Sequence, residues 1–478
     1  MKRHTVKIIS ALMALLVILL LTAVPAGAVS FPNKVNVRSE SALVVSLDSG
    51  QAVYEKDADS KRYPASTTKI MTYIIAVENI DDIDNTSIEI KKKLLDQLKG
   101  TQSSTAKLSN HVGKKVKVID LLYGMMVPSG NDAALVLADY VGDGDIQKFV
   151  DMMNEKAEEL GCQNTHFTNP DGLHDPDHYT TARDLYLISK YALTLPYFEQ
   201  ISNTTEYTIA GDEEPLVTTN YLIDKERGGD YYYSYARGIK TGTTDEAGRC
   251  LVTTASADGH SYIAVLLGAP LKETKKTQGE EAEKAQGEDA EEAQVEESEE
   301  AGDEDEEYYT FTDAADLFRW ALVDLEMQTV KSADTPVCER KVKLAWGRDK
   351  ITLVPAKNLN AIMPKDLKQS NIIVETDVPE EIKAPLYTDE PVGTASVYYA
   401  EEGKEKQLVA TVDLVPAEQV DRSGILAVLD VIATIFKSYW FLVIIGIIVL
   451  LFIIYVIAAK IHRAHLKRNR KVKRYRNF

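Results

Sequence analysis

The 478-residue chain is poor in cysteine and lacks metal-binding spacings. Its three cysteines, Cys162, Cys250 and Cys338, are widely scattered, and no C-x-x-C pair occurs. So sparse a set is not a disulfide scaffold, although one disulfide is compatible with it, and its pairing cannot be read from the sequence. We expect no metal and no cofactor, and a core built by hydrophobic packing, for which the chain is long enough.

One turn-rich loop, 169–177, is a candidate metal site. His174, Asp175 and Asp177 lie in it, and His178 follows directly. No compact helix presents these side chains together, as a metal cluster would require. We therefore interpret them as solvated loop residues.

The charge of the chain is concentrated in two blocks of opposite sign. The formal net charge is −19, but residues 280–307 hold 16 acidic residues against one lysine, so the remaining chain sums to −4. Residues 460–478 carry nine lysines and arginines and no acid. A positive charge confined to one tail does not indicate nucleic-acid binding. The acidic stretch predicts a disordered insertion, 272–307, near the end of a folded domain.

Long apolar runs occur near both ends. Residues 1–28 combine early basic residues, an apolar run at 8–24 and the small residues Ala-Gly-Ala at 26–28, which predicts a secretory signal peptide; an uncleaved anchor is the alternative. Residues 439–459 contain no charge and are long enough to span a bilayer. The basic tail 460–478 then predicts a cytoplasmic end, and it argues against a buried core helix at 439–459. The body of the protein is expected outside the cell.

The chain between these runs divides by hydrophobic pattern. Residues 41–46 and 52–55 predict a hairpin turning at Ser49-Gly50, and 250–255 with 262–267 predict a second hairpin turning at Asp258-Gly259. Helical patterns occur at 119–126, 132–140, 146–160, 181–195 and 311–325. We expect an α/β (α+β) domain at 29–330, a small all-β domain at 331–420 and a juxtamembrane helix at 421–438.

The pattern Pro-Ala-Ser-Thr-Thr-Lys at 64–69 opens an apolar helical stretch. Ser66 and Lys69 are three residues apart, hence neighbours on one helical face. A hydroxyl beside an amine is a candidate nucleophile with its base. Ser104 and Lys107 have the same spacing, but the residues after them make a poor buried helix.

Two further short motifs follow in order. Ser129-Gly130-Asn131 lies in the turn between two predicted helices, and Lys240-Thr241-Gly242 opens the strand-rich segment. Each motif alone is common. Together and in this order they match the S-x-x-K, S-x-N and K-T-G set of penicillin-binding proteins and class A β-lactamases.

The chemistry explains this choice of residues. Serine needs a base to attack an amide carbonyl, and lysine serves only when neutral, a state favoured by burial and by a second cation such as Lys240. Ser129 can relay a proton, and Asn131 offers an amide to the substrate backbone. The backbone N–H groups of Ser66 and Thr243 are the expected oxyanion hole.

The chain resembles the D-alanyl-D-alanine carboxypeptidases of peptidase family S11, the low-molecular-weight penicillin-binding proteins. The resemblance covers roughly 38–270 and is carried by the segments 63–71 (YPASTTKIM), 128–134 (PSGNDAA), 169–174 (NPDGLH) and 238–248 (GIKTGTTDEAG). It implies a β-lactamase/transpeptidase-like domain with an antiparallel sheet flanked by helices. The implied catalytic residues are Ser66, Lys69 and Ser129, and the implied substrate-binding residues are Asn131, Lys240, Thr241 and Thr243.

The resemblance also implies binding partners, and two alternative functions stay open beside it. The expected substrates are peptidoglycan stem peptides, with β-lactams as acylating inhibitors. The acidic insertion and the full apolar span depart from the family pattern. A class A-like β-lactamase is one alternative, although 160–182 holds a Pro-Asp-Gly-Leu-His loop instead of a glutamate-bearing one. A catalytically silent wall-binding or sensor protein is the other.

Overall fold

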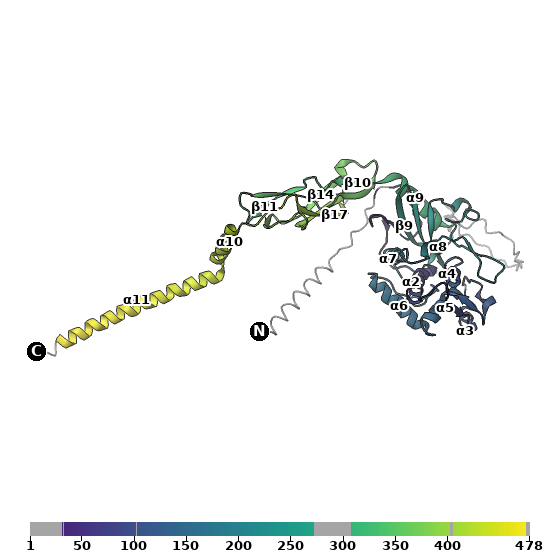
Figure 1. The fold of residues 1–478 in the computed structure, drawn as a ribbon, viewed down its shortest axis with the longest axis horizontal. Coiled ribbons are helices and arrows are strands. Elements are labelled where there is room, and N and C mark those ends of the chain that lie inside the picture. The colour runs from purple at the N-terminus through teal and green to yellow at the C-terminus, as the bar shows by residue number, and fades with distance from the viewer. Residues whose placement is uncertain (1–30, 32, 102, 272–306, 402–404, 475–478) are drawn as a thin grey trace, which may run out of the picture. The chain divides into compact units, whose positions relative to one another are not determined.

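The computed structural model describes residues 31, 33–101, 103–271, 307–401 and 405–474, with the side chains of 467–474 left aside. The predicted signal peptide and the acidic insertion up to residue 306 lie outside these residues. The chain forms two compact units, one built mainly on residues up to 328 and one mainly on residues from 329 onward. The elements of both units are labelled in Figure 1.

A five-stranded antiparallel sheet organises the first unit, in the order β2-β1-β9-β8-β7. Both predicted hairpins are present in it, β1 with β2 and β8 with β9. Strand β7, which carries the Lys-Thr-Gly motif, is at one edge. The strands are β1 (Ser41–Ser46), β2 (Ala52–Lys56), β7 (Ala236–Thr244), β8 (Gly248–Ala257) and β9 (His260–Ala269).

The sheet is covered on both faces. Leu43 and Val265 pair across β1 and β9 and belong to the main helical core, whereas their neighbours Ala42 and Leu266 are equally buried outside that core. Because side chains alternate along a strand, the second pair lies on the opposite face. Helix α9 (Tyr309–Asp324) packs on β8 and β9, and Figure 1 shows it on the other side of β9 from helices α2, α4, α5 and α6.

The helical layer is centred on α2 (Lys69–Asn79), which packs against α5, α6 and α7. The predicted break at 127–130 is present, because one helix ends at Met126 and the next begins at Asn131. The other members are α3 (Lys92–Leu95), α4 (Val118–Met126), α5 (Asn131–Val141), α6 (Ile146–Glu159), α7 (Ala182–Ala192) and α8 (Phe198–Ser202). Short two-stranded sheets join β3 (Ser87–Glu89) to β4 (Lys115–Lys117), and β5 (Glu206–Tyr207) to β6 (Leu216–Val217).

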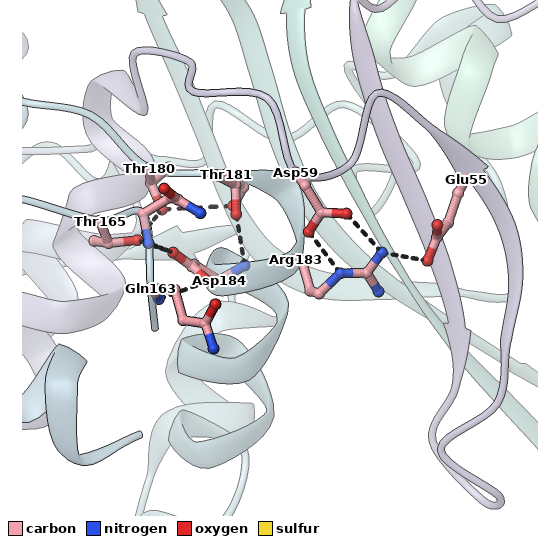
Figure 2. A network of polar contacts seen from close by, with 9 residues as sticks. Glu55, Asp59, Gln163, Thr165, Thr180, Thr181, Arg183 and Asp184 are labelled. Atoms are coloured by element: carbon pink, nitrogen blue, oxygen red, sulfur yellow. Dashed lines mark hydrogen bonds and ion pairs between the residues drawn. The ribbon is translucent and has the colours of Figure 1, made fainter. Parts of the chain in front are cut away.

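A polar network fixes the start of α7, as Figure 2 shows. Thr181 Oγ1 accepts a hydrogen bond from Asp184 N at 3.0 Å and so caps the helix. The buried Asp184 carboxylate accepts bonds from Asn164 N and Thr165 Oγ1, both at 2.8 Å. The loop that follows α6 is thereby tied to α7.

Arg183 extends this network to the sheet (Figure 2). Its guanidinium bonds Asp59 Oδ1 at 2.7 Å and Glu55 Oε1 at 2.6 Å, and Glu55 lies on β2. The segment just before α7 is held a second time by the backbone pairing of Arg62 with Thr180. These bonds set the position of the loop 165–180, which borders the site described below.

The region beyond Leu325 is β-rich, as predicted. Its main sheet has six strands in the order β14-β16-β17-β12-β11-β15, and β10 (Leu325–Lys331) pairs with β13 (Leu359–Pro364). The six strands are β11 (Cys338–Lys343), β12 (Lys350–Pro355), β14 (Ile372–Asp377), β15 (Glu381–Lys383), β16 (Gly393–Tyr399) and β17 (Gln407–Pro416). The predicted boundaries of the two domains, 29–330 and 331–420, stay predictions.

Two helices end the described chain, α10 (Gly424–Lys437) and α11 (Tyr439–Arg474). Within the described residues, α11 is the one helix long and apolar enough to cross a membrane, over Tyr439–Leu466. This stretch contains the predicted span 439–459 and continues beyond it.

Candidate active site

Ser66 lies on a tight turn at the start of the central helix. The prediction placed Ser66 and Lys69 on one α-helix, but residues Ala65–Thr68 form a 3₁₀ turn and Lys69 is the first residue of α2. The Thr67 hydroxyl donates to Pro64 O at 2.6 Å, and the Thr68 hydroxyl donates to Ala65 O at 2.8 Å. These local bonds stabilise the tighter geometry.

Lys69 is fully buried, and its amine makes three contacts. Its Nζ lies 2.8 Å from Ser66 Oγ, 2.6 Å from Asn131 Oδ1 and 2.6 Å from the backbone oxygen of Asp171. The Asn131 and Asp171 oxygens can only accept hydrogen bonds, whereas the Ser66 hydroxyl can also donate one. The predicted Ser66–Lys69 pair is therefore present, and Asn131 and Asp171 fix the orientation of the amine.

Burial lowers the pKa of Lys69 to about 8. The loss of hydration disfavours the ammonium, while the carboxylates of Asp171 and Asp132 partly oppose the shift. The sequence analysis named Lys240 as a cause of this lowering, but burial is the main one. Lys69 instead affects Lys240. The pKa of Lys240 is lowered first by burial and then by the charge of Lys69.

Ser129 and Lys240 form the second hydroxyl–amine pair. Lys240 is 1% exposed, and its Nζ donates to Ser129 Oγ at 2.8 Å and to Thr241 O at 2.9 Å. Ser129 has a φ of 65°, in the left-handed region that side chains rarely adopt. Such backbone strain concentrates at functional sites, and here it sets Ser129 against the edge strand that carries Lys240.

Strand β7 passes directly beside the Ser66 turn. A Cβ atom at Gly242 would stand 2.9 Å from Ser66 N, so only glycine allows this approach. Gly172 makes a similar approach from the loop, where a Cβ would stand 2.0 Å from Ala65 O. The next residue on β7, Thr243, has an exposed side chain.

These residues line a cleft of about 440 Å³. Ser66, Ser129, Thr241 and Thr243 contribute to its wall, whereas Lys69 and Lys240 lie buried behind it. The Thr241 hydroxyl shares a hydrogen bond with that of Thr219. All seven predicted site residues thus gather at one place.

The sequence analysis missed an aromatic and cationic end of this cleft. Arg249 lies on β8 opposite Thr243, and its guanidinium carbon is 3.7 Å from the centre of the Tyr308 ring. Tyr221 and Phe311 also line the cleft, with ring centres 5.7 Å apart. Arg249 lies just after the turn that follows the Lys-Thr-Gly strand. Its position opposite Thr243 in the β7–β8 hairpin is the sequence signal that could have identified it.

His178 is not a solvated loop residue, and that interpretation is wrong. It is 2% exposed, and its Nδ1 accepts a bond from Thr168 N at 3.1 Å while Nε2 lies 2.8 Å from Thr68 Oγ1. Burial lowers its pKa to about 3, so the ring is neutral and Nε2–H donates to Thr68. His178 thereby joins the loop to the turn that carries Ser66.

The Ser104 and Lys107 pair has a different setting. The Lys107 amine is exposed and pairs with Glu214 at 2.7 Å. Ser104 lines the cleft, and its backbone oxygen accepts a bond from Asn131 N at 2.9 Å. Ser104 therefore helps to position Asn131 of the second motif, and Lys107 is not a buried base.

Comparison with known proteins identifies the family. Residues 28–271, about half of the chain, match the family model of the peptidase S11 D-alanyl-D-alanine carboxypeptidases. The chain belongs to this family. The serine acyl-enzyme chemistry general to it agrees with the Ser66–Lys69 pair, and residues 325–422 of this carboxypeptidase match the C-terminal domain of penicillin-binding protein 5.

Curated relatives agree with the family model. The carboxypeptidase is 31% identical to DacF of Bacillus subtilis over 50% of its own chain and 60% of that protein, so it spans less than two thirds of that relative. It is 34% identical to a D-alanyl-D-alanine carboxypeptidase of a Streptomyces species over 54% of its chain and 90% of the relative.

Solved structures support the two-domain architecture. Penicillin-binding protein 5 of Haemophilus influenzae aligns over 83% of this carboxypeptidase and 100% of its own chain, with a TM-score of 0.57 and 24% identity. The carboxypeptidase DacD of Francisella tularensis aligns over 82% and 96%, with a TM-score of 0.58 and 25% identity. The predicted fold class is confirmed, with a sheet-and-helix peptidase domain followed by an all-β domain.

Proposed function

We propose that this carboxypeptidase removes the terminal D-alanine from peptidoglycan stem pentapeptides through an acyl-enzyme on Ser66. The observation that carries the proposal is the contact set of Lys69. A neutral Lys69 gives its two N–H groups to the acceptor oxygens of Asn131 and Asp171. Its lone pair then faces the Ser66 hydroxyl, which is the arrangement of a general base and a nucleophile.

The reaction follows from this arrangement. Ser66 Oγ attacks the carbonyl carbon of the penultimate D-alanine and passes its proton to Lys69, while the N–H groups of Ser66 and Thr243 stabilise the oxyanion. The proton held by Lys69 passes through Ser129 to the amide nitrogen, so D-alanine leaves as an amine and Lys69 is neutral again. Water then attacks the ester, Lys69 takes its proton, and Ser66 leaves by recovering that proton.

The substrate is oriented by its terminal carboxylate. Lys240, Thr241 and Thr243 supply a cation and two hydroxyls at one end of the cleft, and Arg249 adds a second cation there. Asn131 uses one N–H for Ser103 Oγ, at 3.0 Å, and its second N–H serves the substrate backbone. A free carboxylate after the scissile bond is thus the expected requirement.

Release of D-alanine from a stem pentapeptide tests the proposal. The purified protein should release one D-alanine per peptide, and Ser66→Ala should release none. Release by Ser66→Ala would contradict the mechanism, and no release by the wild type would favour the silent sensor. A penicillin adduct on Ser66 that is hydrolysed within seconds would favour the β-lactamase.

We propose in addition that the catalytic unit works outside the membrane. The predicted signal peptide 1–28 would export it, residues 439–459 would anchor it, and the basic tail 460–478 would stay in the cytoplasm. Protease added to intact cells should remove the catalytic unit and spare an epitope placed after residue 478. Loss of that epitope would contradict this orientation.

A further inference from the structure

Residues 91–117 of the catalytic unit carry a block of positive charge. They hold eight lysines, no arginine and one acidic residue, Asp96. The rest of 31–271 holds 15 basic and 34 acidic residues, which conceal the block in the overall charge, so the sequence analysis missed it. An anion that approaches the catalytic unit is therefore attracted at this block and repelled by the net charge of the remainder.

Backbone pairing and a shared cavity bring most of these lysines together. Ile90 N donates to Lys114 O at 2.9 Å, so Lys91 and Lys114 are neighbours. Helix α3 follows Lys91 directly, and strand β4 follows Lys114. We call six of the lysines, all exposed, the lysine-rich surface: Lys91, Lys92, Lys93, Lys99, Lys114 and Lys115.

A cavity of about 520 Å³ opens in the lysine-rich surface. Lys92 lines it from α3, and Lys99 lines it from the end of the 3₁₀ turn Asp96–Leu98. Thr105 and Ser109, both exposed, contribute hydroxyl groups to its wall. Ammonium and hydroxyl groups can both donate hydrogen bonds to the oxygens of an anion.

Most amines of this surface keep their charge available to a ligand. Two of the six form ion pairs, Lys91 with Asp139 and Lys99 with Asp96. Within the part of the chain that the structure describes, the other four have no carboxylate at ion-pair distance. Asp132 also lines the cavity, but its carboxylate already accepts hydrogen bonds from two backbone N–H groups of 106–108.

We propose that the lysine-rich surface binds an anionic polymer of the cell envelope whose units are linked by phosphodiesters. Arginine forms bidentate contacts with single anionic groups, whereas lysine acts as a point charge. Several exposed lysines without arginine therefore suit a repeated single charge better than one small ligand. The proposed position of the catalytic unit outside the membrane gives this surface access to envelope polymers and not to cytoplasmic nucleic acid.

The bound polymer would lie beside the catalytic cleft without filling it. Ser104 lines the cleft, and the next residue, Thr105, lines the cavity of the lysine-rich surface. The surface would thus hold the enzyme on the polymer while Ser66 stays accessible. This binding goes beyond the proposed function and has no part in the catalytic mechanism.

Lysine footprinting of the full chain in nonionic detergent tests the surface. An amine-acetylating reagent labels exposed lysines, and mass spectrometry measures each label with and without poly(glycerol phosphate). The polymer should reduce labelling of Lys92, Lys93 and Lys114 by about fivefold at about 50 mM salt, and about 500 mM salt should abolish this protection. Because each lysine is measured separately, binding by the basic tail 460–478 is distinguished. The internal controls are three exposed lysines elsewhere in the unit, Lys148, Lys190 and Lys225.

Two triple variants of equal net charge test the affinity. The first replaces the three surface lysines, and the second replaces the three control lysines, in each case by glutamine. The first should bind the polymer about tenfold more weakly at about 50 mM salt, and its slope of log affinity against log salt should be shallower by about 2. The second should bind like the wild type. Both should react with penicillin at the wild-type rate.

The outcomes separate this proposal from the proposed function. Protection confined to 460–478, or equal affinity of the two triple variants, would overturn the lysine-rich surface and leave the carboxypeptidase in place. Failure of the wild type to react with penicillin would instead count against the proposed function.

Two further arms test the chemistry of the partner. Poly-L-glutamate of matched charge should protect the surface less than poly(glycerol phosphate), and equal or stronger protection would overturn the phosphodiester assignment. Deletion of 280–306 should leave the labelling of the free chain unchanged. A rise in labelling of the surface lysines would identify the acidic segment as the occupant and overturn the polymer.

Discussion

Two buried lysines determine the chemistry at the scale of single residues. Lys69 and Lys240 are 0% and 1% exposed, and each has its pKa lowered mainly by the loss of hydration. Each amine contacts one serine hydroxyl, Ser66 or Ser129. For Lys69, burial thus supplies what an exposed lysine lacks, a substantial fraction of neutral amine near pH 8.

The pH dependence of acylation follows from Lys69. Its pKa is lowered from 10.5 to about 8, so the neutral base becomes more abundant as the pH rises through about 8. The rate of acylation by a fluorescent penicillin should rise about tenfold per pH unit below this point and level off above it. A rate that stays constant or falls between about pH 6 and 9 would contradict a base of this pKa.

Lys69→Arg tests the need for a neutral base. Arginine keeps the positive charge but does not lose its proton, so acylation should slow by about 10³-fold at every pH. Stopped-flow measurement with the same penicillin gives the rate. Lys93→Arg, at an exposed position of α3, is the control and should match the wild type. Acylation by Lys69→Arg at the wild-type rate would remove Lys69 from the mechanism.

At this scale the sequence predicted every motif residue of the site but not its surroundings. Ser66, Ser129 and Lys240 have side chains whose chemistry can be recognised from residue type and order. The oxygen of Asp171 that accepts from Lys69 is a backbone atom, and any residue type supplies one. His178 was misjudged because a polar loop sequence does not show that the loop folds back onto the Ser66 turn.

At the scale of elements, the site depends on the approach of three segments to one turn. Strand β7, the 169–173 loop and helix α5 reach the Ser66 turn and the start of α2, and glycines at 242 and 172 permit the two closest approaches. Hydrophobic periodicity predicted the amphipathic helices well because they bury one face, as α6 does with Phe149, Val150 and Met153. It did not predict the 3₁₀ turn at Ala65–Thr68, which depends on local hydroxyl bonds to the backbone.

The cap network of α7 should contribute measurably to stability. Asp184→Ala removes a buried acceptor from Gln163 N, Asn164 N and Thr165 Oγ1, and the loss of these partners costs about 2–3 kcal/mol. For a unit of this size, Tm should fall by about 5–10 °C in thermal unfolding. Glu155→Ala, an exposed change on α6, should alter Tm by less than about 1 °C. An unchanged Tm for Asp184→Ala would show that the network carries little stability.

At the scale of the whole molecule, catalysis and anchoring are assigned to separate stretches of the chain. The family match covers 28–271, the second domain match covers 325–422, and the apolar helix begins at Tyr439. The sequence predicted this order because each stretch has its own hydrophobic pattern. The arrangement of the parts in space has no comparable signal in a single sequence.

A truncated chain ending at residue 422 tests this separation. It should remain in the soluble fraction after cell lysis and react with penicillin at the same rate as the full chain, which should sediment with membranes. Gel fluorescence of both fractions measures the distribution and the labelling together. A truncated chain that still sediments with membranes would show that another segment anchors the protein.

The proposed mechanism depends on acylation of Ser66. Mass spectrometry of the truncated chain after incubation with penicillin, followed by peptide mapping, tests it most directly. We expect one penicillin-sized adduct per chain, on Ser66, and none on Ser66→Ala. No adduct on the wild type, or an adduct on another residue, would contradict it.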